Sequence, residues 1–407
     1  MADLPASAMA ALPACRLARV RRAASPLLVA SVALLSLAAP PAAWAVQDCE
    51  LDGQPINPNN GNSTAGKTGL MRCKDRDSGE IVREHQLQNG AYLGIVRYYE
   101  NNKVVKEHSV NARGNREGQA REFSPTGQLL YQSSYDNGRE TGLARSYYPN
   151  GQLRRLTFYA EPGERASAEF TERGQLSALR CGDKPMLAPL LDDARLCGFG
   201  ASPGQVELFD TKGVVRSRLV FAAGKRVRAE NLYDNGKPAS LIETSATQRI
   251  ERRWSSEGVQ RSEVVHLLTE RGSSRQREQE FSEKGTLVRD RSWNPAGEPV
   301  RDQSFYLNGQ PRSTSVYGEG GDARTVEITE FHDNGKQASI GRYLVTSRVR
   351  QSPMGTHQRF GEDGRLRAES SYDDKGRITR ERTWDASGKV ERDDEVFEDG
   401  SRKAFAR

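Results

Sequence analysis

Hydrophobic and polar residues alternate along most of the chain after residue 85. From Leu366 to Tyr372, for example, every second residue is apolar or small, whereas Arg365, Arg367 and Glu369 take the alternate positions. Because successive side chains of a β-strand point to opposite faces of a sheet, this alternation predicts strands with one moderately apolar face and one charged face.

Glycine interrupts these strands at a regular interval. Gly90, Gly114 and Gly138 are each 24 residues apart, and a second glycine, or Asn102, falls near the middle of each unit. Twelve residues hold one strand and a turn, so one unit of 24 residues is a β-hairpin. We predict an all-β fold, an elongated antiparallel meander of stacked β-hairpin repeats. The glycines assigned to structural turns are Gly90, Gly114, Gly127, Gly138, Gly151, Gly364, Gly376 and Gly388.

Proline restricts the type of these turns. Pro125 and Pro149 each stand two residues before the turn glycine, and proline cannot adopt the positive φ that a type I′ turn requires. A type I turn followed by a glycine in the left-handed region, a G1 bulge, is therefore predicted. Asn102 fits the same prediction, because asparagine tolerates left-handed backbone best after glycine.

Two segments lack the regular glycine spacing and divide the chain. Residues 46–84 contain a polar, Asn/Gly-rich stretch that reads as an N-terminal cap, and residues 178–205 form an insertion with one short helical turn. Between and after them, residues 85–177 and 206–407 form two repeat blocks.

Residues 1–45 have the pattern of a secretory signal peptide. Arginines precede an apolar run from Leu27 to Ala39, and Ala43-Trp44-Ala45 supplies small residues for cleavage after Ala45. A retained membrane anchor is the alternative, but the run is shorter than the ~20 residues that span a bilayer. We therefore expect a periplasmic or secreted protein.

Cysteine content agrees with export. Four cysteines follow the signal segment, and their clustering favours Cys49–Cys73 and Cys181–Cys197 disulfides among three possible pairings. Zinc would favour close Cys-x-x-Cys pairs, which the sequence lacks, so no metal is predicted.

The charge balance does not suggest nucleic acid as a partner. Removal of the signal segment lowers the formal net charge from +6 to +3, and arginines alternate with acidic residues along the same segments. This pattern indicates cross-strand ion pairs more than a basic stripe, and export removes the chain from nucleic acid.

The sequence contains motifs that partly match catalytic or cofactor-binding patterns, but none of them has the flanking residues or spacing that the chemistry requires. Gly61–Thr68 matches the P-loop spacing but lacks the apolar strand before it and the helix after it, so no nucleotide is predicted. The acidic segment 75–80 has its glycine one position early for a calcium loop. The five histidines lack paired spacing, and no nucleophile elbow is present. We therefore predict a protein that is not an enzyme and uses no cofactor.

Three consecutive units share the pattern Asn-Gly-x3-Gly, an aromatic pair, and x-Asn-Gly-(Gln/Lys)-(Leu/Val), best seen over residues 85–160. This pattern resembles the MORN repeat variant family, and within it the bacterial YwqK-like antitoxin components. The resemblance implies stacked β-hairpins and an interaction role, with no catalytic residue to carry over. A role like that of an immunity protein is the version compatible with export.

Aromatic residues near the turns are the candidate binding residues. As a ladder along one face they could stack on sugar rings or on a partner's apolar surface, although packing between hairpins explains most of them. Tyr99 and Tyr148, each second in its aromatic pair, are the least explained by packing. The candidates are Tyr98, Tyr99, Phe123, Tyr147, Tyr148, Trp293 and Trp384.

Two functions remain open. The first is an exported scaffold that binds a protein partner, in an antitoxin- or immunity-like role. The second is binding of an envelope ligand, a cell-wall glycan or an anionic lipid headgroup, through the aromatic and arginine-lined face. A hydrolase hidden in the insertion between Cys181 and Cys197 is a third, disfavoured alternative.

Overall fold

The computed structural model describes residues 47–318, 324–347 and 350–406. The expected signal segment, residues 1–45, lies outside the described residues. The described strands belong to one compact unit, Val46–Arg407.

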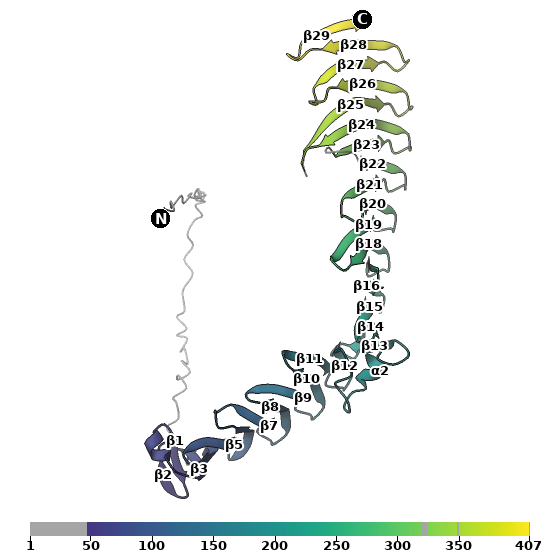
Figure 1. Cartoon of the computed structure of the whole chain (residues 1–407). Helices are drawn as coiled ribbons and strands as arrows, with labels where there is room; N and C mark the ends of the chain where they lie inside the picture. The colour runs from purple at the N-terminus through teal and green to yellow at the C-terminus, as the bar shows by residue number, and fades with distance from the viewer. Residues whose placement is uncertain (1–46, 319–323, 348–349, 407) are drawn as a thin grey trace, which may run out of the picture. The chain divides into compact units, whose positions relative to one another are not determined.

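The described residues form two open antiparallel sheets (Figure 1), and this confirms the predicted fold class. Strands follow one another in chain order except at the start of the first sheet, where the first strand lies between the second and the third. Sheet 1 has 12 strands. These strands are β1 (Gln47–Leu51), β2 (Gln54–Ile56), β3 (Gly69–Asp75), β4 (Ile81–Gln88), β5 (Ala91–Glu100), β6 (Lys103–Val110), β7 (Arg116–Phe123), β8 (Leu129–Asp136), β9 (Arg139–Tyr147), β10 (Leu153–Ala160), β11 (Gly163–Phe170) and β12 (Leu176–Arg180).

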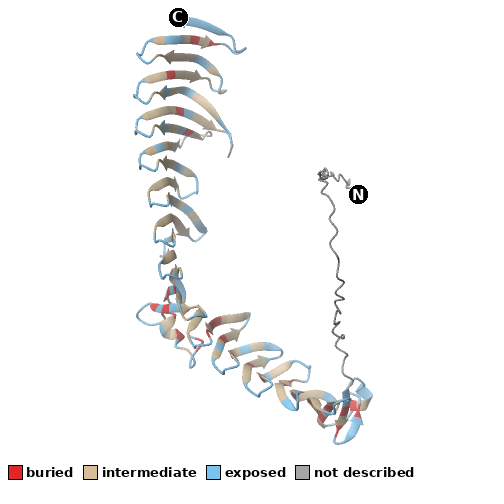
Figure 2. Cartoon of the chain, turned by 180° about the vertical axis from the view of Figure 1, so that it is seen from behind, coloured by how far each residue is buried: buried red, intermediate tan, exposed pale blue. Residues whose placement is uncertain are grey.

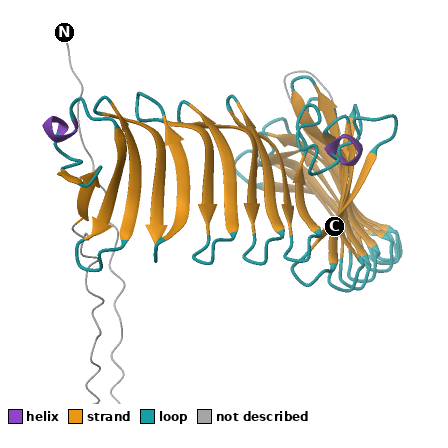
Figure 3. Ribbon diagram, turned by 90° about the horizontal axis from the view of Figure 1, so that it is seen from below, coloured by secondary structure: helices purple, strands orange, loops and turns teal. Residues whose placement is uncertain are grey.

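Sheet 2 continues the same hairpin pattern with 17 strands. These strands are β13 (Gly204–Phe209), β14 (Val215–Ala222), β15 (Lys225–Leu232), β16 (Pro238–Thr244), β17 (Gln248–Trp254), β18 (Gln260–Thr269), β19 (Gly272–Phe281), β20 (Leu287–Trp293), β21 (Pro299–Phe305), β22 (Pro311–Gly318), β23 (Thr325–Phe331), β24 (Gln337–Val345), β25 (Gln351–Phe360), β26 (Leu366–Tyr372), β27 (Ile378–Trp384), β28 (Val390–Val396) and β29 (Arg402–Ala406). Two short helices, α1 (Gly61–Thr64) and α2 (Asp193–Leu196), accompany the sheets (Figure 3).

The turns are of two types, where a single type was predicted. At Gly127, the Ser124 N–H donates to the Gln128 carbonyl and the Gly127 N–H donates to the Ser124 carbonyl, the bonds of a type I turn with a G1 bulge. Gly127 has φ +88°. Gly114, Gly151, Gly364, Gly376 and Gly388 repeat this arrangement, as predicted.

The prediction is wrong at Gly90, Gly138 and Asn102. There, the residue before also has positive φ and the flanking strand residues pair directly, which describes a two-residue turn of the I′ type. The proline argument covered only the turns that contain proline. The Asn-Gly and Asn-Asn pairs at these three positions form the type I′ turn that such pairs favour. Absence of proline does not decide the type alone, because Asn235-Gly236, Asn308-Gly309 and Asn334-Gly335 also lack it and form the G1-bulge turn.

Turns on the same edge of a sheet are tied to one another. The Tyr148 hydroxyl donates to the carbonyl of Phe170 at 2.8 Å, and Tyr233 and Tyr306 make the equivalent bond 21 and 25 residues along the chain, also at 2.8 Å. The turn asparagine two residues later donates to the next turn in the same way, as Asn308 does to the Asp333 carbonyl at 2.9 Å. The Tyr-x-Asn-Gly motif therefore holds one hairpin to the next.

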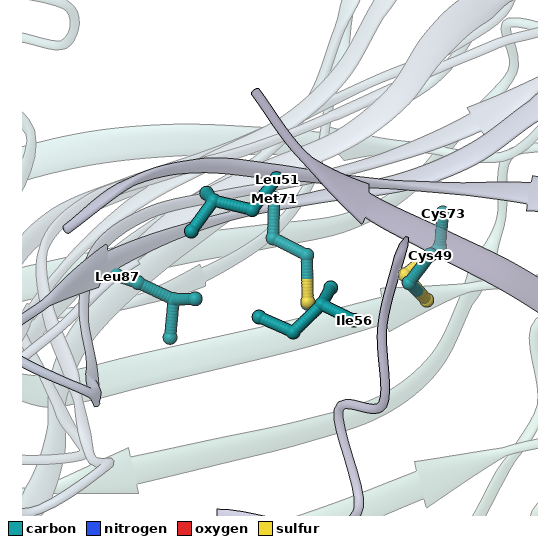
Figure 4. Packing of buried hydrophobic residues seen from close by; sticks show 6 residues of the cluster. All are labelled: Cys49, Leu51, Ile56, Met71, Cys73 and Leu87. Carbon is teal, nitrogen blue, oxygen red and sulfur yellow. A yellow bond between two sulfur atoms is a disulfide. The ribbon is translucent and has the colours of Figure 1, made fainter. Parts of the chain in front are cut away.

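Buried apolar residues of the described chain gather in the cap and near α2, and they are sparse elsewhere (Figure 2). In the cap, the Cys49–Cys73 disulfide joins the paired strands β1 and β3 beside Met71 and Leu87, both completely buried (Figure 4). Most other strands expose both faces, so contacts between neighbouring strands must hold the array together.

The segment between the sheets is the second packed region. The Cys181–Cys197 disulfide closes it, as predicted, and α2 is the expected helical turn. Leu187 inserts against Leu156 of sheet 1, while Leu196 packs against the cluster that contains Val206 of sheet 2. This segment therefore buries apolar surface from both sheets.

Candidate interaction surface

One face of sheet 1 collects tyrosine and histidine side chains. A row of directly paired residues crosses this face from β5 to β10, one residue per strand. The row is Tyr98, Lys106, Glu122, Tyr131, Ser146 and Arg155. Tyr135 and Tyr159 extend the same face, because they lie four residues after Tyr131 and Arg155 in their strands. We call this surface the tyrosine face, made of Tyr98, His108, Tyr131, Tyr135, Glu140 and Tyr159.

Glu140 is the centre of the tyrosine face. Tyr131 and Tyr135 both donate their hydroxyls to Glu140 Oε1, the second at 3.2 Å. Burial raises the pKa of Tyr131 most, and the hydrogen bond to Glu140 raises it further. Burial and the charge of Glu140 also raise the pKa of Tyr135 and of Tyr159. Two neutral phenols therefore share one carboxylate oxygen on an open sheet.

Arg116 completes this cluster. Its Nη1 donates to the Tyr135 hydroxyl at 3.2 Å, and its guanidinium lies 5.3 Å from the centre of the Tyr135 ring. The tyrosine thus bridges a cation and a carboxylate, and its ring is held in a fixed position.

Two histidines lie at the other end of this face. The His85 ring lies 4.6 Å from that of Tyr92, and the His108 ring stacks on Tyr98 at 6.1 Å. Burial, with the charges of Arg83 and His108, lowers the pKa of His85 to about 4, and burial also lowers the pKa of His108. Both imidazoles are therefore neutral at pH 7.

These histidines predict an acid-sensitive fold. A histidine with a lower pKa in the folded state binds protons more readily when unfolded. The neutral His85 therefore contributes fully to the stability of the fold above its unfolded pKa near 6.5. This contribution is lost as the pH falls toward 4. We expect the free energy of unfolding, measured by urea titration, to fall across that window. His85→Gln should reduce the fall, and an equal fall in this variant would contradict the assignment.

The opposite face of sheet 1 is neutralised by its own ion pairs. Arg72 and Arg97 contact Glu84 at 2.8 and 3.5 Å, and Arg97 and Arg121 contact Glu107 at 2.8 and 3.8 Å. Burial alone would raise the pKa of Glu84, but hydrogen bonds to Arg72 and Tyr99 hold it below its usual value. Such a ladder stabilises the sheet and leaves few charges for a partner.

The seven predicted binding aromatics do not share one face. Tyr98 lies on the tyrosine face, whereas Tyr99 projects to the other side and donates its hydroxyl to Glu84 at 2.7 Å. Tyr148 bonds the neighbouring turn, so the two residues least explained by packing both have intramolecular partners.

The remaining four aromatics are spread over both sheets. Phe123 and Tyr147 pair with aliphatic residues at turn bulges. Trp293 lies between Arg275 and Arg291, and Trp384 lies beside Arg382. The structure therefore does not gather these residues into one site.

Sequence reasoning missed Tyr131, Tyr135, Tyr159 and Glu140. The usable signal was Tyr131 and Tyr135, four residues apart in one predicted strand and hence on one face. Their convergence on Glu140 depends on the register between strands, which the repeat spacing does not define.

Within residues 47–318, 324–347 and 350–406, no group of three or more His, Cys, Asp or Glu side chains could hold a metal ion. No helix in the same described part of the chain is long and apolar enough to span a bilayer.

Comparisons with known proteins give one family and distant structures. A comparison with curated proteins found no match. Among solved structures, TarM is 16% identical over 22% of this chain and 18% of its own, with a TM-score of 0.17. A Photorhabdus luminescens Tc holotoxin pore is 13% identical over 83% of this chain and 20% of its own, with a TM-score of 0.16.

A TcdB2–TccC3 structure is similarly distant, 12% identical over 83% of this chain and 22% of its own, with a TM-score of 0.15. The chain matches about a fifth of the length of these three structures. The MORN repeat variant family matches residues 116–137 and 140–161, the strands that carry Arg116, Tyr131, Tyr135 and Glu140. These two segments of the chain are therefore similar to MORN repeat variants.

Proposed function

We propose that this protein is a scaffold outside the cytoplasm that binds a protein partner through the tyrosine face. The observation that carries the proposal is that the Tyr131 and Tyr135 hydroxyls both donate to Glu140, with Arg116 stacked on Tyr135. Tyrosine and arginine are the residue types that dominate binding energy at protein interfaces. Rigid rings on a sheet also lose little conformational freedom when a partner binds.

The two sheet faces support the choice of surface. The opposite face already satisfies its charges with the Glu84 and Glu107 ion pairs, so docking there would have to desolvate formed pairs. The tyrosine face also carries ion pairs, Lys106–Glu122 at 2.6 Å and Arg155–Glu164 at 2.7 Å. Between them it offers half-buried rings with polar tips, which can exchange water for partner atoms at a smaller cost.

We further propose an immunity-like role, in which the partner is a protein toxin in the same compartment. Two disulfides indicate an oxidising compartment, and export of the chain after cleavage at Ala45 is part of this proposal. The MORN-variant repeats fit a non-catalytic scaffold, and inhibition by binding needs no chemistry of its own. A gene for a secreted toxin next to this one would support this role.

The test is capture of partners from a periplasmic extract with the full chain as bait. We expect a stoichiometric protein, and we expect Tyr135→Ala to weaken its binding by about 2 kcal/mol, roughly 30-fold in Kd. Tyr317→Ala is the matched control, because Arg324 stacks on Tyr317 at 5.2 Å as Arg116 does on Tyr135 at 5.3 Å. Equal loss in both variants, or no captured protein, would contradict the proposal.

A further inference from the structure

A polar groove of about 620 Å³ lies on one face of sheet 2, across β20 to β24. Its floor is a straight row of directly paired residues, in which Arg289 faces Ser304, Ser304 faces Ser313, and Ser313 faces Glu330. Neighbouring strands lie about 4.8 Å apart. The row therefore presents one polar group per strand at a spacing similar to the length of one sugar unit.

The floor offers hydrogen-bond donors and acceptors side by side. Arg289 holds Asp302 in a bidentate pair, with Nε and Nη2 at 3.0 and 2.7 Å from the two carboxylate oxygens. The Ser304 and Ser313 hydroxyls contact each other at 2.7 Å, and each can donate or accept. Such a row can match a ligand whose own groups are hydroxyls, which also donate and accept.

One end of the groove has an aromatic residue with a fixed position. Tyr306 lines the groove, its hydroxyl donates to the Phe331 carbonyl at 2.8 Å, and the Arg312 guanidinium lies 5.9 Å from its ring centre. An apolar ring beside a row of polar groups is the combination that ligand sites use to orient a small molecule.

The charges of the groove decide the class of ligand. Two arginines, Arg289 and Arg312, and two carboxylates, Asp302 and Glu330, line it, so the formal charge of these four residues is zero. An anionic headgroup or a phosphate would meet Glu330 and Asp302 as well as the arginines, and it would gain no net attraction. A neutral polyhydroxyl ligand can use both signs, because its hydroxyls donate to carboxylates and accept from guanidinium groups.

We propose that this groove is a binding site for a neutral glycan. The site gives the envelope-ligand hypothesis a definite location, separate from the tyrosine face of sheet 1. Its volume lies in the range of about 300–1,000 Å³ that is usual for ligand pockets. Specificity comes from the polar row. The two serine hydroxyls bond each other and Glu330 accepts from Ser339 at 2.8 Å, so a ligand must offer hydroxyls that replace the bonds it displaces.

The experiment uses the purified full chain on an array of neutral oligosaccharides built from hexose and N-acetylhexosamine units, followed by calorimetric titration with the best binder. Vesicles of phosphatidylglycerol form a second arm. We expect binding to neutral oligosaccharides that changes little with salt, since no net charge is neutralised.

The variants test the row itself. The double variant Ser304→Ala with Ser313→Ala, and separately Glu330→Gln, should each weaken oligosaccharide binding at least roughly tenfold. Thr314→Val is the matched control, because Thr314 lies next to Ser313 in β22 on the opposite face and bonds Gln303 there at 3.1 Å. It should bind like the unaltered protein.

Three results would overturn the proposal: no binding to any neutral oligosaccharide, salt-sensitive binding to the lipid vesicles alone, or undiminished binding by variants whose circular dichroism and melting are unchanged. Failure here leaves protein binding through the tyrosine face standing, since that is measured on a different sheet with different variants.

Discussion

A Gly204→Ala variant is expected to lose about 3 kcal/mol of stability at the start of sheet 2. A β-carbon at this position would lie 2.0 Å from the Leu196 carbonyl oxygen and 2.6 Å from that of Arg195. These are backbone atoms of α2, which cannot move aside as a side-chain end could. Overpacking of a tight site usually costs about 1–3 kcal/mol, and a backbone clash belongs at the upper end.

The expected damage is local. Gly204 opens β13 and pairs with Phe221, which belongs to the buried cluster with Val206 and Leu219. If α2 moves away from β13, Leu196 leaves that cluster and the first strands of sheet 2 become exposed. In a repeat array each unit contacts only its neighbours, so distant hairpins should keep their structure.

Hydrogen exchange with mass spectrometry can locate this change, because long repeat arrays do not unfold in one step and a single melting temperature would average over them. We expect faster exchange in β13 and β14 and unchanged exchange in β26 to β28. Gly163→Ala is the control, because Gly163 has no positive φ and no atom within 4 Å of its added β-carbon. Equal exchange in both variants would show that the approach of α2 to β13 is not rigid.

Local features of the sequence predicted much of the fold. Glycine spacing defined most hairpins because most of the turns in this chain contain a left-handed residue, and few residues other than glycine adopt that conformation readily. The Cys49–Cys73 and Cys181–Cys197 pairs were predictable because each closes a short loop. The turn type at Gly90 and Asn102 was predicted wrongly, because an argument from the copies that contain proline was extended to copies that lack it.

The candidate surfaces were harder to predict, because they depend on register. Tyr131 and Glu140 meet only because β8 and β9 pair with an irregularity after Gln132, and composition says nothing of such a shift. The groove of sheet 2 likewise needs Arg289, Ser304, Ser313 and Glu330 to fall opposite one another. In contrast, Tyr148 was singled out as unexplained because its bond to the Phe170 carbonyl joins turns 22 residues apart.

The second large effect is expected at Asp193, the first residue of α2. Its side chain is 1% exposed, and its Oδ2 accepts the backbone N–H groups of Met186 and Leu187 at 2.6 and 3.0 Å. Leu187 is completely buried against Leu156 of sheet 1. One carboxylate oxygen therefore holds the loop that covers the end of that sheet.

Asp193→Ala should destabilise the protein by about 3 kcal/mol, because two buried N–H groups lose their acceptor and each unsatisfied group costs about 1–3 kcal/mol. Asp193→Asn should cost less, since its amide oxygen can still accept both bonds. Asp192→Ala is the neighbouring control. The exposed side chain of this N-cap residue accepts the Arg195 N–H at 3.1 Å and lies 3.5 Å from the Arg195 guanidinium, and an N-cap contributes about 1 kcal/mol. Urea unfolding and hydrogen exchange of β10 to β12 would measure the loss of stability in each variant. A loss for Asp193→Ala no larger than for Asp192→Ala would contradict the prediction. It would mean that water reaches those N–H groups and that this carboxylate does not hold the loop.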